Sequence, residues 1–331
     1  MSNKFIFNYD DGDWIPNIDN NNSKFDHLLK RTWKAALDDK LMRYQIGYRT
    51  LPYKVISEKP FSLIAAYIPG RAPGVRRTPQ CMTSLQMPFN HEQFNFTKID
   101  PNEELFRMEY CSKDGVVSIA SVIVNKSPVE YCSSLLVPSL SKCSPQVLTA
   151  ESLRFAIQTV ALSGQRSLRL GFNSLGSMAS VNHLHWHIYY FDYHLTIETL
   201  SIKDGFLDGW PIPTLAFDIK QFNENEFNRV VNKIMTIIDF CLNEEQIAHN
   251  LFVTRTDDDY VRVLIWLLEP IFGVKNGLTL NSAICELSGY FICSSETILN
   301  ILQNNNQIYL SDGTINVSSG DLISSMKRLG R

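Results

Sequence analysis

The chain has 331 residues, of which 44% are hydrophobic and 20% are charged, and its formal net charge is −3. These proportions are typical of an ordinary globular protein and exclude the disordered, collagen-like and disulfide-scaffold classes. The nearly balanced charge argues against nucleic acids and acidic membrane surfaces as partners, because either would require an excess of basic residues. We therefore expect neither kind of partner.

The N-terminus and the cysteines indicate the compartment. The chain becomes acidic at Asp10 and Asp11 before an apolar core of signal-peptide length develops. No run approaches the roughly 18–20 apolar residues that a membrane span requires. The seven cysteines are an odd number and form no C-x-x-C pair, which is typical of reduced thiols rather than of a disulfide or zinc framework. We expect a cytoplasmic protein.

Three segments have apolar residues at helical spacing. The first helix is predicted to begin at Ser23, with Asp26 in an approximate capping box. The second follows Thr149, and the third begins near Asn223 with Glu226 at the capping-box position. These are the only long helices that the sequence predicts.

Between the helices, short apolar runs predict strands. They lie at residues 61–68, 117–124, 135–137, 168–171, 183–191, 251–255 and 260–268. Because the strands do not alternate regularly with helices, we expect an α+β fold in which helices back an antiparallel sheet. Glycines and prolines cluster within residues 196–213. We therefore predict an N-terminal domain of residues 1–198 and a smaller α+β domain of residues 199–331.

Three of the seven histidines are His183, His185 and His187, a pattern with a chance of roughly 0.003 under random placement. On a strand, alternate side chains share one face and are about 6.6 Å apart. We therefore expect the three imidazoles on one face and the intervening apolar residues in the core. These intervening residues are Leu184, Trp186 and Ile188.

Three interpretations of the cluster compete. A strand lining a pocket can be rich in histidine without chemical purpose. A zinc or iron site would recruit a further ligand, and His249 and Asp192 stand at no telling spacing. The third interpretation is nucleophilic catalysis at phosphorus, for which a neutral imidazole is competent near pH 7.

The segment before the cluster, residues 171–182, contains two glycines, three serines and two asparagines. Such a turn allows an anion to approach the backbone closely and offers N–H and hydroxyl donors. A phosphate needs such a loop and a metal does not, so the loop favours catalysis at phosphorus. Gly176, Ser177 and Asn182 are candidate contacts to the phosphates of a nucleotide.

The small polar loop followed by alternating histidines resembles the histidine triad superfamily of nucleotide hydrolases and transferases. Within it, residues 172–176 and 182–185 are similar to the GDP-hexose phosphorylases of animals and plants. His187 stands where the animal enzymes have histidine and the plant enzymes have glutamine. Further similar segments are residues 33–44, 70–71, 94–98, 125–137 and 286–290. The resemblance implies a histidine-triad-like sheet, as in galactose-1-phosphate uridylyltransferases.

The resemblance also implies an activity. GDP-D-glucose and inorganic phosphate would yield GDP and glucose 1-phosphate through a guanylylated histidine, with no cofactor and ping-pong kinetics. His185 matches the nucleophile, and His183 and His187 match the flanking residues that orient it or bind phosphate oxygens. Ser180 matches the phosphate-contacting serine of the superfamily, and Asn173 lies one position from the usual asparagine. The implied partners are a GDP-hexose and phosphate, and a homodimer is left open.

Cationic side chains supply further candidates for phosphate binding. Arg71 lies with Arg76 and Arg77 in a loop rich in glycine and proline, and Lys98 follows an aromatic segment. The planar guanidinium group suits phosphate oxygens. A solvated loop is the alternative interpretation for these side chains.

One departure from the family pattern precedes the strand at residues 135–137. Where the family has Gly-His, this chain has Cys132-Ser133. We expect a local adjustment of the turn, since the histidines and their loop are intact.

Other functions stay open at this point. A metal-dependent nucleotide hydrolase could use the same three histidines. Diadenosine polyphosphate phosphorylases and hexose-1-phosphate uridylyltransferases are related activities. Those families usually have a shorter flanking pattern or His-Pro-His-Pro-Gln, and this chain has Leu184 and Trp186 where those prolines would be. A guanine-nucleotide binder without catalysis is the third alternative.

Overall fold

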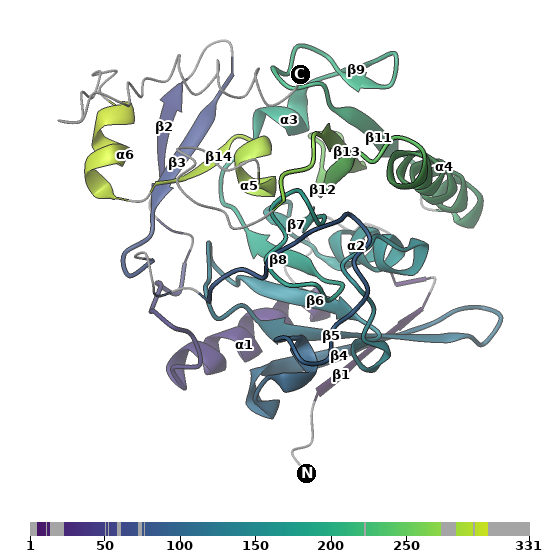
Figure 1. Ribbon diagram of the computed structural model, residues 1–331, viewed down its shortest axis with the longest axis horizontal. Helices are drawn as coiled ribbons and strands as arrows, with labels where there is room; N and C mark the ends of the chain where they lie inside the picture. The colour runs from purple at the N-terminus through teal and green to yellow at the C-terminus, as the bar shows by residue number, and fades with distance from the viewer. Residues whose placement is uncertain are drawn as a thin grey trace.

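The computed structural model describes residues 5–10, 12–13, 23–49, 51, 53–57, 61–71, 75, 77–221, 223–272, 283–293 and 295–303. Within these residues, eleven strands form one large sheet and three form a small sheet, with helices packed against them (Figure 1). The predicted α+β class is confirmed. The sheet is not wholly antiparallel, however, because its first strand, β1 (Phe5–Asp10), pairs in parallel with β4 (Glu104–Cys111).

The large sheet is built in two halves that meet at one strand pair. The first half has the order β1, β4, β5 (Val117–Val124), β6 (Ser134–Pro138), β8 (Trp186–Tyr190), β7 (Leu168–Asn173). The second half continues with β12 (Ala248–Arg255), β13 (Val261–Leu268), β11 (Leu215–Ile219), β10 (Phe206–Leu207), β9 (Ile202–Lys203). The predicted segments 1–198 and 199–331 thus supply opposite halves of one continuous sheet, and their division into domains stays a prediction.

A small sheet also combines both segments of the chain. It has the order β14 (Tyr290–Cys293), β3 (Leu63–Tyr67), β2 (Tyr53–Ser57). β14 is parallel to β3, whereas β2 is antiparallel to it. Strands from the two ends of the sequence therefore lie side by side (Figure 1).

The three long helices begin where the sequence predicts. α1 (Lys24–Asp38), α2 (Ala150–Leu162) and α4 (Glu224–Asn243) follow Ser23, Thr149 and Asn223, and each of these side chains accepts a backbone N–H of the first turn. Such caps satisfy donors that have no partner within the helix. α2 packs against β6 and β7 of the first half and against β12 and β13 of the second half.

Two capping-box side chains act differently from the prediction. The Asp26 carboxylate accepts hydrogen bonds from the Ser163 and Tyr190 hydroxyls and so ties α1 to the sheet. Glu226 pairs with Arg229 on the surface of α4.

Shorter elements complete the fold: α3 (Thr196–Thr199), α5 (Ile284–Leu287), α6 (Glu296–Gln303), η1 (Phe96–Lys98), η2 (Pro101–Glu103), η3 (Leu140–Lys142).

Six of the seven predicted strands are confirmed, as β3, β5, β6, β7, β12 and β13. The strand predicted at residues 183–191 is shorter than expected, because β8 begins only at Trp186. The last pairs that β8 makes with its neighbours are Leu136 with Trp186 and Gly171 with His187. His183 and His185 therefore lie outside the sheet, and the prediction that one strand carries all three histidines is wrong.

The two faces of β8 have different surroundings. Trp186 is fully buried and shares its face with Tyr190, whose hydroxyl reaches α1. The Tyr189 hydroxyl lies on the opposite face, 3.8 Å from Cys285 Sγ of α5. Because side chains alternate along a strand, His187 also points to the α5 side.

The described helices include none with the length and apolar character of a membrane span.

Candidate active site

The three histidines form a cluster although only His187 belongs to β8. The rings of His185 and His187 have centroids 5.2 Å apart. The Phe96 ring contacts the imidazoles of His183 and His185, with ring centroids 5.2 Å and 5.1 Å away. His183 and His185 are buried, at 0% and 4% exposed, and His187 is half-buried. The turn at residues 183–185 thus brings the imidazoles of His183 and His185 against one aromatic ring, with His187 beside His185.

The backbone fixes the tautomer of His185. Its Nδ1 lies 2.7 Å from the carbonyl oxygen of His183. A carbonyl oxygen only accepts, so Nδ1 carries the proton and Nε2 carries the free lone pair. Within the described residues Nε2 makes no hydrogen bond, and unlike Nε2 of His183 it is not completely buried. Nε2 is therefore the nitrogen of this ring that can attack an electrophile.

Burial also determines the charge of His185. It lowers the pKa of the imidazole to about 4, against a smaller raising effect of the hydrogen bond to the His183 backbone. The ring is consequently neutral at pH 7, and only a neutral imidazole has a lone pair for nucleophilic attack.

His183 is held in a different way. Its Nδ1 accepts the backbone N–H of Phe96 at 3.1 Å, and its ring packs edge-on against Phe89 at 5.0 Å. Its pKa is lowered to about 4, first by burial and then by the neighbouring His185, while the Leu140 backbone raises it. His183 is thus neutral and enclosed, so it is suited to orienting its neighbour rather than to meeting a ligand.

The predicted phosphate loop is anchored to α5 and to β12. Asn173 Oδ1 accepts the backbone N–H of Ile284 at 2.9 Å, and Ser174 N donates to Asn250 Oδ1 at 3.1 Å. Gly176 has a φ of +74°, and a Cβ there would come 2.8 Å from the Leu85 side chain. Only glycine fits both the conformation and the space, which keeps the loop close against its neighbours.

The remaining loop residues divide by exposure. Ser177 is buried, and its hydroxyl has no hydrogen-bond partner in the part of the chain that the structure describes. Ser180 is half-buried, and its carbonyl accepts the Gln80 N–H at 3.1 Å. Asn182 donates from its amide to the carbonyls of Met87 and Pro88. The Asn182 amide therefore holds the segment at residues 80–96 against the loop.

The cationic candidates are held by other groups. Arg71 donates to the Tyr44 hydroxyl at 3.1 Å and to the Ser127 carbonyl at 3.2 Å. Lys98 is exposed and donates to the Glu92 carbonyl at 3.0 Å. These bonds fix the two side chains to surrounding loops rather than to the histidines. Arg76 lies outside the described residues, and Arg77 lies over the Phe94 ring at 3.5 Å.

The structure adds a residue that the sequence did not single out. Gln146, which is 1% exposed, donates to the carbonyl of Asn173 and hydrogen-bonds both backbone polar groups of His185. Its backbone N–H donates to Asn182 Oδ1 at 2.9 Å. Gln146 thus joins the loop to the nucleophile candidate. It stands in an irregular segment without periodicity, so no local pattern marks it.

The residues weighed as additional metal ligands lie elsewhere or are enclosed. His249 is buried on β12 and stacks on Phe172 with centroids 6.0 Å apart and an interplanar angle of 9°. Burial lowers its pKa to about 4. Among the described residues, no three His, Cys, Asp or Glu side chains have the arrangement of a metal site. His249 is best explained as a packed core residue.

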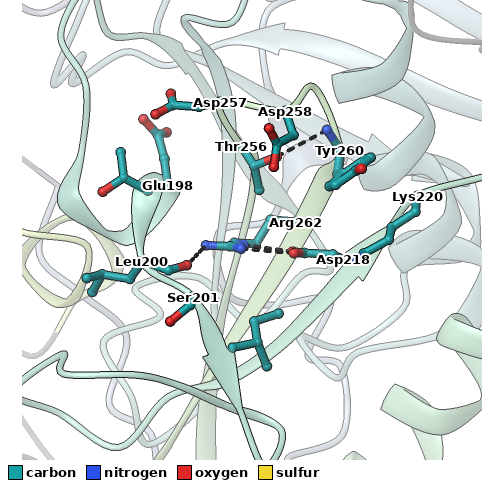
Figure 2. A pocket seen from close by; sticks show the side chains of 12 residues that line it. Glu198, Leu200, Ser201, Asp218, Lys220, Thr256, Asp257, Asp258, Tyr260 and Arg262 are labelled. Atoms are coloured by element: carbon teal, nitrogen blue, oxygen red, sulfur yellow. Dashed lines mark hydrogen bonds and ion pairs between the residues drawn. The ribbon is translucent and has the colours of Figure 1, made fainter.

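A cavity of about 450 Å³ is lined by Asp218, Tyr260 and Arg262 among other residues (Figure 2). It lies at the opposite end of the strands from the histidines. β8 and β12 run in the same direction, since each is antiparallel to β7. His185 precedes β8, whereas the residues that line the cavity include Thr256 and Asp257, which follow β12. Two of its acidic groups have arginine partners, because Asp218 pairs with Arg262 and Glu198 with Arg169. We therefore assign these charges to the stability of the fold.

A neutral imidazole with one nitrogen held in a hydrogen bond and the other unbonded, beside a loop of small polar residues, is typical of enzymes that use histidine as a nucleophile. The sequence comparisons specify which family of enzymes this is. Residues 24–189 match the family described as GDPGP1-like, N-terminal domain. The chain belongs to this family of GDP-hexose phosphorylases.

Individual relatives are similar over most of the chain. GDP-D-glucose phosphorylase 1 of Danio rerio is 33% identical over 92% of this chain and 94% of its own length. GDP-D-glucose phosphorylase 1 of Homo sapiens is 34% identical over 81% of this chain and 73% of its own length. GDP-L-galactose phosphorylase 2 of Arabidopsis thaliana is 28% identical over 80% of this chain and 66% of its own length.

Proposed function

We propose that the protein is a GDP-D-glucose phosphorylase that transfers GMP from GDP-D-glucose to inorganic phosphate through a guanylylated His185. One observation carries the assignment of the nucleophile: His185 combines a neutral ring, a fixed tautomer and an Nε2 that makes no hydrogen bond in the described part of the chain and is not completely buried. The names of the animal relatives support the substrate, and the higher identity to them favours GDP-D-glucose over GDP-L-galactose.

In the first step, His185 Nε2 attacks the α-phosphorus of the GDP-hexose. A P–N bond forms, the bond from the α-phosphorus to the bridging oxygen breaks, and that oxygen leaves with its electron pair as part of hexose 1-phosphate. In the second step, an oxygen of inorganic phosphate attacks the same phosphorus. The P–N bond breaks, its electron pair returns to Nε2, and GDP is released.

The carbonyl of His183 assists the first step. When Nε2 bonds to phosphorus, the imidazole becomes positively charged, and the Nδ1–H···O bond of 2.7 Å then becomes a charge-assisted one. Stabilisation that grows as the charge develops accelerates the reaction rather than merely binding the substrate. This role requires only the backbone of His183, while its ring fixes the turn through Phe96.

Contacts to the phosphates belong to the proposal as well. The half-buried His187 ring, next to His185, is suited to donate to the oxygens of the α-phosphate. Ser180 and the loop at Gly176 and Ser177 would offer hydroxyl and backbone donors. We also infer that β4, β5, β6, β8 and β7 with α1 and α2 form a histidine-triad-like half, since this half carries all three histidines at one strand end.

The test is a substrate panel with and without inorganic phosphate. Purified protein is incubated with GDP-glucose, GDP-mannose, UDP-glucose and diadenosine tetraphosphate, in buffer with a chelator. We expect phosphate-dependent release of GDP from GDP-glucose, and a GMP adduct on His185 by peptide mass spectrometry when phosphate is omitted. Activity that requires added zinc or iron would support the metal-dependent hydrolase instead, and nucleotide binding without turnover would support a non-catalytic binder.

Two substitutions test the covalent step. His185→Ala removes the attacking atom, and His185→Asn retains a polar side chain whose amide nitrogen is no nucleophile. Both variants are expected to lose at least about 10³-fold in kcat and to form no adduct. Full turnover by folded His185→Asn would refute the covalent mechanism.

A further inference from the structure

The backbone of His185 needs partners that the sheet does not supply. β6 pairs with β8 as far as Trp186, and β7 pairs with β8 as far as His187. His185 precedes both limits and is 4% exposed. A buried backbone N–H or C=O without a partner is strongly unfavourable, so something other than a strand must bind these groups.

The side chain of Gln146 binds both groups. Its Oε1 accepts the His185 N–H at 2.8 Å, and its Nε2 donates to the His185 carbonyl at 3.1 Å. The carboxamide thus takes the place of a peptide group on a neighbouring strand. Nε2 also donates to the Asn173 carbonyl at 2.9 Å, at the end of β7. One buried amide therefore makes three hydrogen bonds to the backbone around the imidazole.

The same short segment holds the other residues of the turn. The Leu184 N–H donates to the Ser144 carbonyl at 2.9 Å, and the Gln146 N–H donates to Asn182 Oδ1 at 2.9 Å. Residues 144–146 are therefore bound to three positions on the opposite segment, at residues 182, 184 and 185. Because Nδ1 of the His185 ring is bonded within this turn, the direction of Nε2 depends on the turn keeping its shape.

We propose that Gln146 is a positioning residue for the transfer reaction. It replaces the missing strand partner of the His185 backbone and thereby fixes the direction of His185 Nε2. This inference rests on the proposed function, since it assigns Gln146 a role in the attack on phosphorus. Gln146 itself does not touch the reacting atoms. It acts through the backbone of His185, and so it should affect the chemical step more than substrate binding.

Gln146→Met is the first test, because methionine has a similar length and no hydrogen-bonding amide. The variant loses the partners of the His185 N–H, the His185 carbonyl and the Asn173 carbonyl. A displacement of about 1 Å in a reacting group can lower a rate about 10²-fold. We expect kcat and the rate of adduct formation to fall about 10²-fold, with KM for GDP-glucose changed by less than about threefold.

Gln146→Glu is the second test, and it applies even if the methionine variant does not fold. A protonated carboxyl can accept from the His185 N–H and donate to one carbonyl, whereas the ionised form would face the carbonyls of His185 and Asn173. Three titratable groups lie near this site. His183 and His185 are neutral above their pKa of about 4, and His187 lies beside His185 and is common to the wild type and both variants. We expect the activity of Gln146→Glu to fall as pH rises, in the range where wild-type activity is constant.

Gln158→Met is the matched control. Gln158 lies on α2, is 2% exposed, and accepts the Tyr9 hydroxyl at 3.0 Å. Its replacement removes a buried amide of the same kind far from the histidines. We expect it to lower thermal stability without changing kcat, KM or the pH profile.

The outcomes separate this inference from the proposed function. If wild-type protein neither turns over GDP-glucose nor forms an adduct, the proposed function fails. If the wild type does both and Gln146→Met matches Gln158→Met in kcat, the positioning role is refuted while the function stands. A wild-type pH profile in Gln146→Glu would refute the role in the same way.

Discussion

The Nδ1 of His185 lies 2.7 Å from the backbone carbonyl oxygen of His183, two residues earlier in the chain. A carboxylate in this position would raise the pKa of the ring strongly through its charge, whereas a carbonyl is neutral and cannot take up the proton. The imidazole therefore keeps a fixed tautomer and stays uncharged. A backbone group suits a histidine that must act as a nucleophile near neutral pH.

The pH dependence of adduct formation follows from this environment. Burial lowers the pKa of His185 to about 4, so the neutral form prevails at all pH values well above 4. We expect the rate of adduct formation in the absence of phosphate to stay constant from pH 7.5 to about 5 and to halve near pH 4. An exposed imidazole would produce the same decrease near pH 6.5.

Rapid-quench mass spectrometry measures this rate, and the diphosphate of the nucleotide sugar stays fully ionised over the whole range. Far-UV circular dichroism at each pH serves as the control for folding. A midpoint near 6.5 in folded protein would contradict the buried position of the His185 ring.

A second prediction concerns Glu130. Burial raises the pKa of its carboxyl to about 8, although hydrogen bonds from backbone N–H groups and from Tyr290 act in the opposite direction. The contribution of protonated Glu130 to the stability of the fold is complete below 4.5, the pKa in the unfolded chain, and is lost as pH rises through 8. The loss amounts to about 1.4 kcal/mol per pH unit in this window. Glu130→Gln cannot ionise, so its stability relative to the wild type should increase by about 4 kcal/mol between pH 5 and pH 8.

Urea unfolding of both proteins at pH 5, 6, 7 and 8 gives this difference. Glu226→Gln is the control, because Arg229 lowers the pKa of this exposed carboxyl and it is ionised throughout the range. Parallel stability curves for wild type and Glu130→Gln would show that Glu130 is ionised in the folded protein at pH 5.

The turn before β6 carries a third prediction. Cys132 has a φ of +55°, in the left-handed region that costs a residue with a Cβ about 1–2 kcal/mol. Glycine is the residue of the family pattern at this position, and it adopts this conformation freely. We expect Cys132→Gly to be more stable than Cys132→Ala by up to about 1 kcal/mol, although glycine is usually the less stable of the two.

Ala156→Gly on α2 shows the usual order, since it should cost about 1 kcal/mol in a helix. Equilibrium unfolding in urea compares the three variants. Greater stability of Cys132→Ala than of Cys132→Gly would contradict the left-handed conformation of the turn.

The buried ion pair of Arg169 and Glu198 carries a fourth prediction. Both side chains are 3% exposed, and Arg169 donates to the two Glu198 oxygens at 2.7 and 2.9 Å. Removing one partner leaves a buried charge unpaired, so Glu198→Ala should destabilise the fold by about 3–5 kcal/mol. Because the pair lies at the strand ends opposite His185, kcat of the folded variant should equal that of the wild type.

Thermal unfolding and steady-state kinetics at a temperature well below the transition test both parts. The exposed pair of Arg229 and Glu226 provides the comparison, and Arg229→Ala should cost less than about 1 kcal/mol. A selective loss of kcat in Glu198→Ala would connect the distant cavity to the reaction.

The long helices and the central strands could be predicted because their signals are local. Ser23, Thr149 and Asn223 cap helices through contacts three residues away, and continuous apolar runs mark β5 and β13. The sequence did not predict β1, β2, β4, β9, β10, β11 or β14. β4, for example, contains Glu104, Arg107 and Glu109 within its apolar pattern.

The candidate site was predictable in part for the same reason. The spacing of the histidines indicates that they act together, but where β8 begins depends on where its neighbours β6 and β7 stop pairing. Gln146 is 39 residues from His185 in the chain, so its role follows only from the tertiary fold. The cytoplasmic location and the homodimer stay predictions.

The pairing of β7 with β12 has a consequence for the folding of this protein during its synthesis on the ribosome. Residues 168–173 leave the exit tunnel long before residues 248–255, which supply their hydrogen-bonding neighbour. Until then the nascent chain exposes a bare strand edge, which is a template for pairing with other polypeptides. Premature termination between these segments would make that exposure permanent, and the resulting fragment would be prone to aggregate.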